Sequence, residues 1–186
     1  ALRNGAHAIC EKPLVIYPQD MHIIKDIEKE TGKNVSTILQ LRYHPTILAL
    51  KKEIDEGEDK IYDIDLSYIT TRGKWYLKSW KGDVKKSGGV ATNIGIHFFD
   101  MITWIFGDVK ENIVHHYGPH KAAGFLKLEK ARVRWFLSLD YHDLPIVATQ
   151  KEMRTYRSIT VDGKEIEFSG GFTDLHTVTY QNILDG

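Results

Sequence analysis

The residues best suited to chemistry lie in the segment from Gly88 to Asp100, GGVATNIGIHFFD. Its apolar residues recur at helical spacing and continue beyond it, which predicts a helix over 93–106 that is anchored in a core. His97 would project from that helix as a rigidly held imidazole, a group that moves protons near neutral pH. Asn93 lies four residues earlier, so both belong to one helix face, with Asp100 near it. The same spacing also fits a histidine satisfied within the core.

A second candidate is Lys12, within Glu11-Lys12-Pro13. The tripeptide follows residues 7–10, an apolar stretch typical of a buried strand, and ligands of open α/β sheets sit at the carboxyl ends of strands. A lysine there can donate hydrogen bonds to a hydroxyl or carbonyl oxygen, and burial or a nearby cation lowers its pKa. A surface lysine in a tight turn is the other interpretation.

Residues 72–86 combine cationic and aromatic side chains, among them Arg72, Trp80 and several lysines. Such a mixture could bind single-stranded nucleic acid by stacking. The balance of 25 Lys and Arg against 25 Asp and Glu, together with Asp83 in this segment, argues against that partner. A long polar loop between a strand and a ligand-facing helix is more typical of a lid over a site. There Arg72 could hold a carboxylate or phosphate through two parallel hydrogen bonds.

Other chemistries are disfavoured by what the sequence contains and lacks. A single cysteine, Cys10, rules out a disulfide framework and a cysteine-rich zinc site, and we expect it to be a packed thiol. His116 and His120 are separated by a Gly-Pro pair, so we expect solvated loop histidines rather than a metal site. The chain has no Gly-x-Gly turn for a dinucleotide and no apolar run of roughly 20 residues that could cross a membrane.

The predicted elements change character along the chain. Residues 1–41 alternate helix and strand, as in a parallel layer, whereas residues 61–170 are mostly strands around one inserted helix. We expect a helix tail capped by Gly5, helices over 18–32, 44–57, 93–106 and 175–184, strands over 7–10, 35–41, 61–71, 109–117, 131–141, 156–161 and 165–168, and a loop without periodicity over 74–87. Asp162-Gly163 predicts a two-residue hairpin turn. The fold class is α/β (α+β), with the end of a Rossmann-like layer followed by a large, mainly antiparallel open sheet covered by helices on one face.

Three motifs occur together and in order. They are Glu-Lys-Pro at 11–13, Gly-Gly-x-x-x-Asn-x-Gly-x-His at 88–97 and Leu-His-Thr-x-x-Tyr at 175–180. This combination resembles the Gfo/Idh/MocA family of NAD(P)-dependent sugar oxidoreductases. Stretches 40–45 (QLRYHP), 80–83 (WKGD) and 91–97 (ATNIGIH) are similar to the branch that oxidises UDP-N-acetylglucosaminuronate at its 3-hydroxyl.

The resemblance implies an N-terminal Rossmann domain that binds the dinucleotide, followed by an α/β domain whose open sheet packs against another subunit. By this likeness residues 1–17 are the C-terminal remnant of the dinucleotide-binding domain. Residues 18–186 form the substrate-binding and oligomerisation domain, without the family's final strand. The resemblance further implies NAD or NADP as cofactor, a cytoplasmic homo-oligomer, and a fragment that is inactive alone because the glycine-rich turn lies outside it.

The resemblance also assigns roles to residues of this chain. Lys12 matches the family's active-site lysine, which contacts the substrate hydroxyl and the nicotinamide, and His97 matches the histidine that acts as base. Asn93 stands where many members have Asp, and an amide can orient a hydroxyl but cannot take its proton. The implied substrate-binding residues are Arg72, Asn93, Tyr43 and Trp80, and the implied cofactor-binding residues are Glu11, Lys12 and Arg42.

The expected activity is oxidation of a sugar hydroxyl on a small-molecule nucleotide sugar. The 3-hydroxyl of a UDP-N-acetylhexosaminuronate, in the synthesis of bacterial surface polysaccharide precursors, is the leading substrate position. A dehydrogenase of an inositol or simple sugar is an alternative, and a non-catalytic assembly module with the same fold is another. Neither nucleic acid nor a membrane is expected as a partner.

Overall fold

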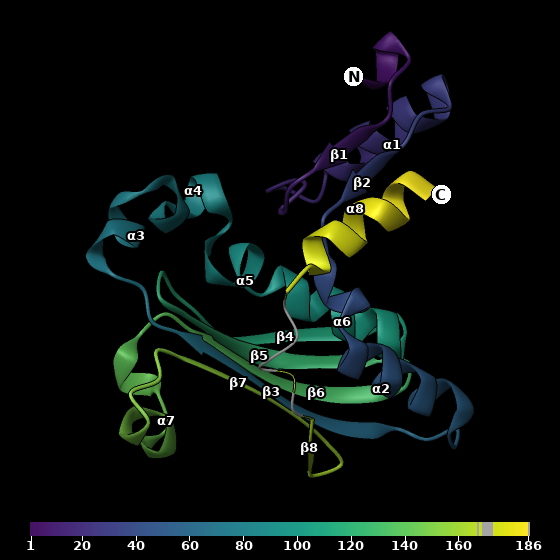
Figure 1. The fold of residues 1–186 in the computed structure, drawn as a ribbon. Coiled ribbons are helices and arrows are strands. Elements are labelled where there is room, and N and C mark those ends of the chain that lie inside the picture. Colours follow the sequence, from purple (N-terminus) through teal and green to yellow (C-terminus); the bar gives the residue numbers. More distant parts are fainter. Residues whose placement is uncertain (167, 169–172, 186) are drawn as a thin grey trace.

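The computed structural model of the chain describes residues 1–166, 168 and 173–185. In this part, β1 (Ala8–Cys10) and β2 (Val35–Thr37) form a small parallel sheet. A six-stranded sheet has the order β4-β5-β6-β3-β7-β8 (Figure 1). Its strands are β3 (Tyr62–Thr70), β4 (Val109–Tyr117), β5 (Lys121–Leu128), β6 (Ala131–Ser138), β7 (Thr155–Val161) and β8 (Lys164–Ile166). Only the β3–β6 pair is parallel, so the prediction of a mainly antiparallel sheet is confirmed.

Eight α-helices lie in the described part of the chain, and some of them begin or end at residues that favour capping. They are α1 (Asp20–Thr31), α2 (Pro45–Glu56), α3 (Lys74–Lys78), α4 (Val84–Ser87), α5 (Gly89–Asn93), α6 (Ile96–Phe106), α7 (Ile146–Gln150) and α8 (Leu175–Asp185). Gly32 ends α1 with a left-handed backbone at φ 64°, as glycine readily does. Pro45 opens α2, where the His44 side chain accepts a hydrogen bond from the Thr46 N–H at 3.2 Å.

One face of the six-stranded sheet is covered by helices, with α2 and α6 lying across it (Figure 1). The predicted strand over 61–71 is confirmed as β3, which alternates between the two faces: Ile64 and Leu66 are buried on this face, while Asp63 and Asp65 point away. The helices and strands share one apolar core, which includes Ile47, Leu50, Ile54, Phe98, Met101, Ile102, Ile105, Val133 and Leu137. Burial of these side chains fixes the position of α6, the helix that carries His97.

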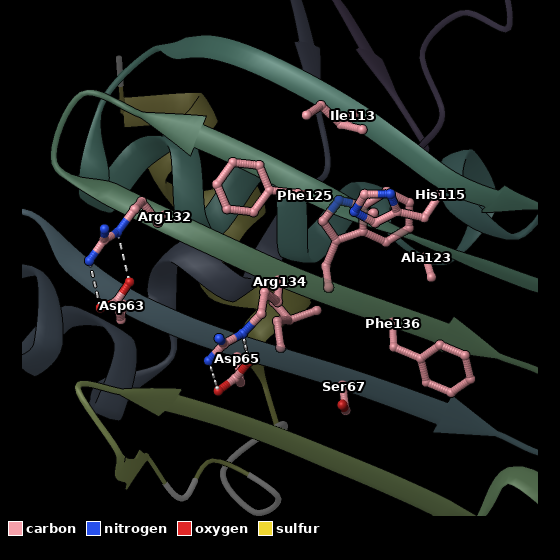
Figure 2. Close-up of a pocket in the computed structure, with 13 residues that line it drawn as sticks. Asp63, Asp65, Ser67, Ile113, His115, Ala123, Phe125, Arg132, Arg134 and Phe136 are labelled. Carbon is pink, nitrogen blue, oxygen red and sulfur yellow. Dashed lines mark hydrogen bonds and ion pairs between the residues drawn. The ribbon is translucent and has the colours of Figure 1, made fainter.

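Most of the opposite face of the sheet is open and mixes charge with apolar area, whereas at one end Ile69 is buried against Leu144 and Ala148. Figure 2 shows Asp63 facing Arg132 and Asp65 facing Arg134 across the parallel β3–β6 pair. Each arginine donates two hydrogen bonds to its carboxylate, at 2.8 and 2.7 Å for the first pair and 2.5 and 2.7 Å for the second. The large apolar side chains of this face are Ile113, Phe125 and Phe136. A hollow of about 790 Å³ lies over this face.

The small sheet and its helix lie beside the large sheet, together with α8 (Figure 1). In α1 the apolar side chains of Met21, Ile24 and Ile27 are only half-buried, and Ile23 is 60% exposed. None of the residues of α1 is fully buried. The 3₁₀ turn Gln40–Tyr43 connects the two parts, since it contacts α2, α6 and α8.

The prediction of a continuous helix over 93–106 is wrong. The segment forms α5 and α6, which are separated at Ile94 and Gly95, and the N–H groups of both residues donate to the Val90 carbonyl at 3.0 Å. The break lies at a closely packed glycine, since a Cβ added to Gly95 would lie 2.5 Å from the Ala91 carbonyl oxygen and 2.6 Å from Leu137 Cδ1. Asn93 therefore ends one helix, and His97 belongs to the first turn of the next.

The prediction of an irregular loop over 74–87 is also wrong. The segment forms α3, a 3₁₀ turn at Trp80–Gly82 and α4. Local caps explain it, because the Ser79 hydroxyl accepts from the Lys81 N–H at 3.3 Å and the Asp83 carboxylate accepts from the Lys85 N–H at 3.0 Å. Turns this short are held by caps and need no amphipathic period.

Strand predictions succeed where the pattern is regular and are wrong in three places. The strands over 35–41 and 131–141 end early, at Thr37 and Ser138, because 3₁₀ turns follow at Gln40–Tyr43 and Tyr141–Asp143. The sequence did not predict β5, in which two of the alternating buried positions are the small residues Ala122 and Gly124. A Cβ added to Gly124 would lie 2.4 Å from the Ile113 carbonyl oxygen.

The turn between the last two strands is confirmed. Asp162 and Gly163 both have positive φ, 50° and 78°, as a two-residue hairpin turn of this kind requires. Asp162 adds a bond of its own, because its carboxylate accepts from the Asp63 N–H at 2.9 Å. The predicted C-terminal helix is also confirmed as α8, and Gly5 caps the short N-terminal 3₁₀ turn at φ 82°.

Candidate active site

A polar pocket of about 210 Å³ lies where the end of β1 meets α5, α6 and the covered face of the large sheet. Its lining residues are Lys12, Gln40, Leu41, Tyr68, Arg72, Asn93, Ile94, His97, Phe98 and Arg157. Four of the residues singled out from the sequence are therefore brought together: Lys12, Arg72, Asn93 and His97. The larger hollow on the open face of the sheet contains none of these four.

Lys12 reaches the pocket from the turn after β1 and is held by Asn93. Its ammonium donates to the Asn93 backbone carbonyl and, at 3.4 Å, to the Asn93 side-chain oxygen. Burial lowers the pKa of Lys12, the positive charges of Lys81 and Arg72 lower it further, and Glu11 opposes them. The lysine thus joins the N-terminal layer directly to the helical segment that carries Asn93.

His97 lies in the first turn of α6 and is largely shielded from solvent. Burial lowers its pKa to about 4, and the nearby positive charges of Lys12 and His176 act in the same direction. Its Nδ1 atom is buried and has no hydrogen-bond partner among the described residues. The imidazole is therefore neutral at physiological pH, and a neutral imidazole can accept a proton.

The remaining charge of the pocket comes from two arginines that lie over aromatic rings. The guanidinium carbon of Arg72 lies 6.0 Å from the centre of the Tyr76 ring, and that of Arg157 lies 5.3 Å from the Tyr68 ring. Together with Lys12 they give the lining three cationic side chains, and none of the ten lining residues is Asp or Glu. A lining of this composition favours an anionic ligand.

Four other residues singled out from the sequence lie outside the lining of this pocket. Arg42 forms a bidentate ion pair with Asp100 of α6, with one contact at 2.7 Å. Tyr43 and Arg42 border a separate hollow of about 350 Å³ beside α8. Trp80 is half-exposed, with the Lys81 ammonium 5.8 Å from its ring centre. Glu11 directly precedes Lys12 and contributes charge to it.

Sequence reasoning missed several residues of the site. Tyr76 is 3% exposed, and its phenol oxygen accepts a hydrogen bond from Asn93 Nδ2 at 2.8 Å. The Oε1 atom of Gln40 lines the pocket, buried and without a hydrogen-bond partner among the described residues. The motif QLRYHP contained a signal for Gln40, whereas nothing in the local sequence marks Arg157, which comes from β7.

The other chemistry considered from the sequence does not form a site in the part of the chain that the structure describes. No group of three or more His, Cys, Asp or Glu residues there could hold a metal ion. His116 lies within the exposed strand β4 rather than in a loop, and Cys10 is a half-buried free thiol. Among the described helices, none has the length and apolar character needed to span a bilayer.

This fold and this pocket define a class of protein. The model of the C-terminal alpha/beta domain of the Gfo/Idh/MocA oxidoreductase family matches residues 51–165, most of the chain. The chain therefore belongs to this family, as its motifs indicated. The matched region contains Arg72, Asn93 and His97, whereas Lys12 precedes it.

Solved structures and curated relatives refine the comparison. The WlbA (WbpB) dehydrogenase from Thermus thermophilus, in complex with NAD and alpha-ketoglutarate, is 54% identical with a TM-score of 0.95, over 100% of this chain and 60% of that one. Its structure with NAD and UDP-GlcNAcA is 53% identical, with a TM-score of 0.94 and the same coverage. The oxidoreductase YteT of Bacillus subtilis is 29% identical over 127 residues, which are 64% of this chain and 30% of that protein.

A further relative is the inositol 2-dehydrogenase of Rhizobium meliloti. It is 27% identical over 106 residues, which are 57% of this chain and 31% of that protein. The chain thus spans 60% of the WlbA chain and less than a third of the curated relatives that it matches.

Proposed function

We propose that the intact protein containing this chain oxidises a sugar hydroxyl with NAD or NADP, and that its substrate is a UDP-N-acetylhexosaminuronate oxidised at the 3-hydroxyl. The observation that carries the proposal is the pocket in which Lys12, Asn93 and His97 converge, in a chain 54% identical to a dehydrogenase that binds NAD. The same dehydrogenase binds UDP-GlcNAcA. The product would enter the synthesis of bacterial surface polysaccharide precursors, in the cytoplasm.

The proposal divides the chain into two parts. Residues 1–17 close a dinucleotide-binding domain, and residues 18–186 form the substrate-binding and assembly domain. The pocket fits the nicotinamide end of the cofactor, because the buried Oε1 of Gln40 is an unused acceptor that a carboxamide N–H or a sugar hydroxyl would satisfy. Lys12 and Gln40 would hold that end, with Glu11 adjacent, while Arg42 supports α6 through Asp100.

His97 supplies the base that the reaction requires. Oxidation of a secondary hydroxyl removes one proton from oxygen and one hydride from carbon, and a carbonyl forms. When bound, NAD supplies the hydride acceptor. The neutral His97 imidazole takes the hydroxyl proton, because burial and its cationic neighbours keep it unprotonated at working pH.

Lys12 stabilises the oxygen as it loses the proton. Its ammonium is anchored by Asn93 and donates to the developing alkoxide, whose negative charge is favoured in a pocket lined by cations. Asn93 orients the lysine and the substrate hydroxyl without exchanging a proton. Arg72 supplies a guanidinium for the carboxylate of a uronate substrate.

A substrate panel on the intact enzyme tests the assignment. We expect NADH formation with UDP-GlcNAcA and at least tenfold lower kcat/KM with inositols, simple sugars and UDP-N-acetylglucosamine. UDP-N-acetylglucosamine is the matched control, since it carries the same diphosphate and has a hydroxymethyl group in place of the carboxylate. Preference for myo-inositol over every UDP-sugar would instead favour the alternative suggested by the inositol 2-dehydrogenase relative.

The open face of the sheet supports a homo-oligomer as part of the proposal. The edge strand β4 is exposed along its whole length, and Ile113 and Phe125 project from the uncovered part of the face. A second copy of the chain would cover this apolar area and the Asp–Arg pairs beside it. Light scattering should give at least a dimer, and a stable monomer would contradict this part of the proposal. If the chain were part of a non-catalytic assembly module, the intact protein would associate in the same way but would show no turnover.

A further inference from the structure

We propose that Tyr76 is a positioning residue for the lysine of the pocket: its phenol oxygen fixes the orientation of the Asn93 carboxamide, and the carboxamide aims the Lys12 ammonium. The inference rests on the proposed function for the identity of the reaction. Its geometrical basis is a chain of three side chains that come from three separate elements, the turn after β1, α5 and α3.

Asn93 is the central member of this chain and is 5% exposed. Its Nδ2 donates to Tyr76 Oη at 2.8 Å, and its Oδ1 accepts from Lys12 Nζ at 3.4 Å. The backbone carbonyl of Asn93 also accepts from the same ammonium. Both ends of the carboxamide therefore have a partner, as buried polar groups require.

The partners fix which way the carboxamide faces. A lysine ammonium can only donate, so the amide must turn its oxygen toward Lys12. That orientation points the amide N–H groups at Tyr76, whose oxygen accepts one of them. Without the phenol oxygen this donor would be buried and unpaired, and the amide would be free to turn its nitrogen toward the ammonium.

The consequence for Lys12 concerns its third proton. An ammonium has three N–H groups, and two of them are taken by the two oxygens of Asn93. The remaining N–H has no acceptor among the described residues, and Lys12 lines the pocket, so this N–H is available to a ligand there. The direction of that N–H, and so its alignment with a substrate hydroxyl, depends on the placement of Asn93 Oδ1.

Tyr76 is itself held firmly enough to act as a reference point. Its N–H donates to the Gly73 carbonyl at 2.9 Å, and its carbonyl accepts from the Ser79 hydroxyl at 2.7 Å. The Trp75 ring lies edge-on at 5.8 Å. Burial raises the pKa of Tyr76, so the phenol stays neutral over the working range and its oxygen remains a hydrogen-bond acceptor for an amide. The short helix α3 therefore contributes to the pocket through one oxygen atom.

Tyr76→Phe in the intact enzyme removes this oxygen and keeps the ring. We expect kcat to fall about tenfold. We also expect the alkaline limb of the kcat/KM profile to move to lower pH, because an ammonium that loses an acceptor deprotonates more readily. Tyr62→Phe is the matched control, since Tyr62 is also buried and donates one hydroxyl bond, to the Glu58 carbonyl at 3.3 Å, far from the pocket. The control should leave both readouts unchanged.

Two further variants make the proposal decisive. In an Asn93→Ala background, Tyr76→Phe should lower kcat by less than a further twofold, since the carboxamide that Tyr76 orients is absent. In an Asn93→Asp background, Tyr76→Phe should also lower kcat only slightly, because a carboxylate presents an oxygen to Lys12 in either orientation. Losses that multiply in both backgrounds, or a Tyr76→Phe enzyme with wild-type kcat and pH profile, would overturn the proposal.

A measurement without cofactor or substrate separates this inference from the proposed function. Urea unfolding of the same four proteins (wild type, Tyr76→Phe, Asn93→Ala and the double variant) gives the coupling between the two side chains directly. We expect a significant coupling whichever sugar the enzyme oxidises. A wild-type enzyme inactive on UDP-GlcNAcA would refute the substrate assignment, whereas additive stabilities would refute the contact between Tyr76 and Asn93.

Discussion

Along β3, Leu66 and Ser67 are neighbours in sequence but belong to opposite faces of the sheet. The face of Leu66 is sealed by α2 and α6, and at its margin burial lowers the pKa of both Lys12 and His97. The face of Ser67 is open, and its charged residues pair with one another in solvent, as Asp65 does with Arg134. The comparison teaches that exclusion of water, rather than the number of charged groups, shifts the pKa values of side chains on one side of this sheet.

The largest expected effect on activity comes from removing the two side chains of the covered side that are proposed to act on the substrate. His97→Ala and Lys12→Ala should each lower kcat by about 10³-fold, since proton transfer and charge stabilisation are each worth several kcal/mol of barrier. Equilibrium titration should show that both variants still bind NAD. Turnover near the wild-type value in both would remove the assignment of this pocket as the active site.

A second expected effect is a difference in the free energy of unfolding between substitutions on the two faces. Leu66→Ala should lower the free energy of unfolding by roughly 3 kcal/mol, because Leu66 is 1% exposed and its removal leaves a cavity. Ser67→Ala, one residue along on the open face, should change it by less than about 0.5 kcal/mol. Urea denaturation of the two variants measures the difference, and equal losses would mean that the faces do not differ in packing.

A third effect is expected in acid. The folded-state pKa of His97 is about 4, below the ordinary 6.5, so between these values the unfolded chain binds a proton that the folded chain does not. Stability from this source is complete above pH 6.5 and is lost as pH falls toward 4, by roughly 3 kcal/mol in total. His97→Gln should remove this loss, whereas His116→Gln on exposed β4 should retain it. Parallel pH curves for wild type and His97→Gln would contradict the burial of the imidazole.

The smallest effect concerns the open side. Arg134→Ala should change the stability of the folded chain by less than about 1 kcal/mol, because its bidentate pair with Asp65 is exposed to solvent. The same variant should weaken association of the intact protein by a larger factor if a second copy covers this face, as proposed. Sedimentation equilibrium measures this. Unchanged association of Arg134→Ala would place the subunit contact elsewhere.

The sequence predicted those parts of the fold whose pattern is local. The alternation of β3, the cap of α1 at Gly32 and the Asp162-Gly163 turn depend on neighbours in the chain. The break before α6 and the existence of β5 were not predictable in this way. Both depend on glycines, Gly95 and Gly124, that let distant segments approach closely, and such contacts leave no periodic trace.

The same division applies to the site. Lys12, Asn93 and His97 occur in motifs, and the structure brings them into one pocket. Tyr76 and Arg157 enter from α3 and from β7, so their roles appear only when the chain is folded. Arg42, which the resemblance placed beside the cofactor, is engaged with Asp100 instead of lining the pocket.

The interruption at Ile94 and Gly95 has an electrostatic consequence for the histidine. In an unbroken helix from Gly89 to Phe106, His97 would lie near the middle, where the aligned peptide dipoles contribute little. The break makes it the second residue of α6, next to the end of the helix where free N–H groups concentrate partial positive charge. That charge disfavours a protonated ring. The interruption of the helix before Ile96 thus acts on the imidazole in the same direction as burial, and favours the form that accepts a proton.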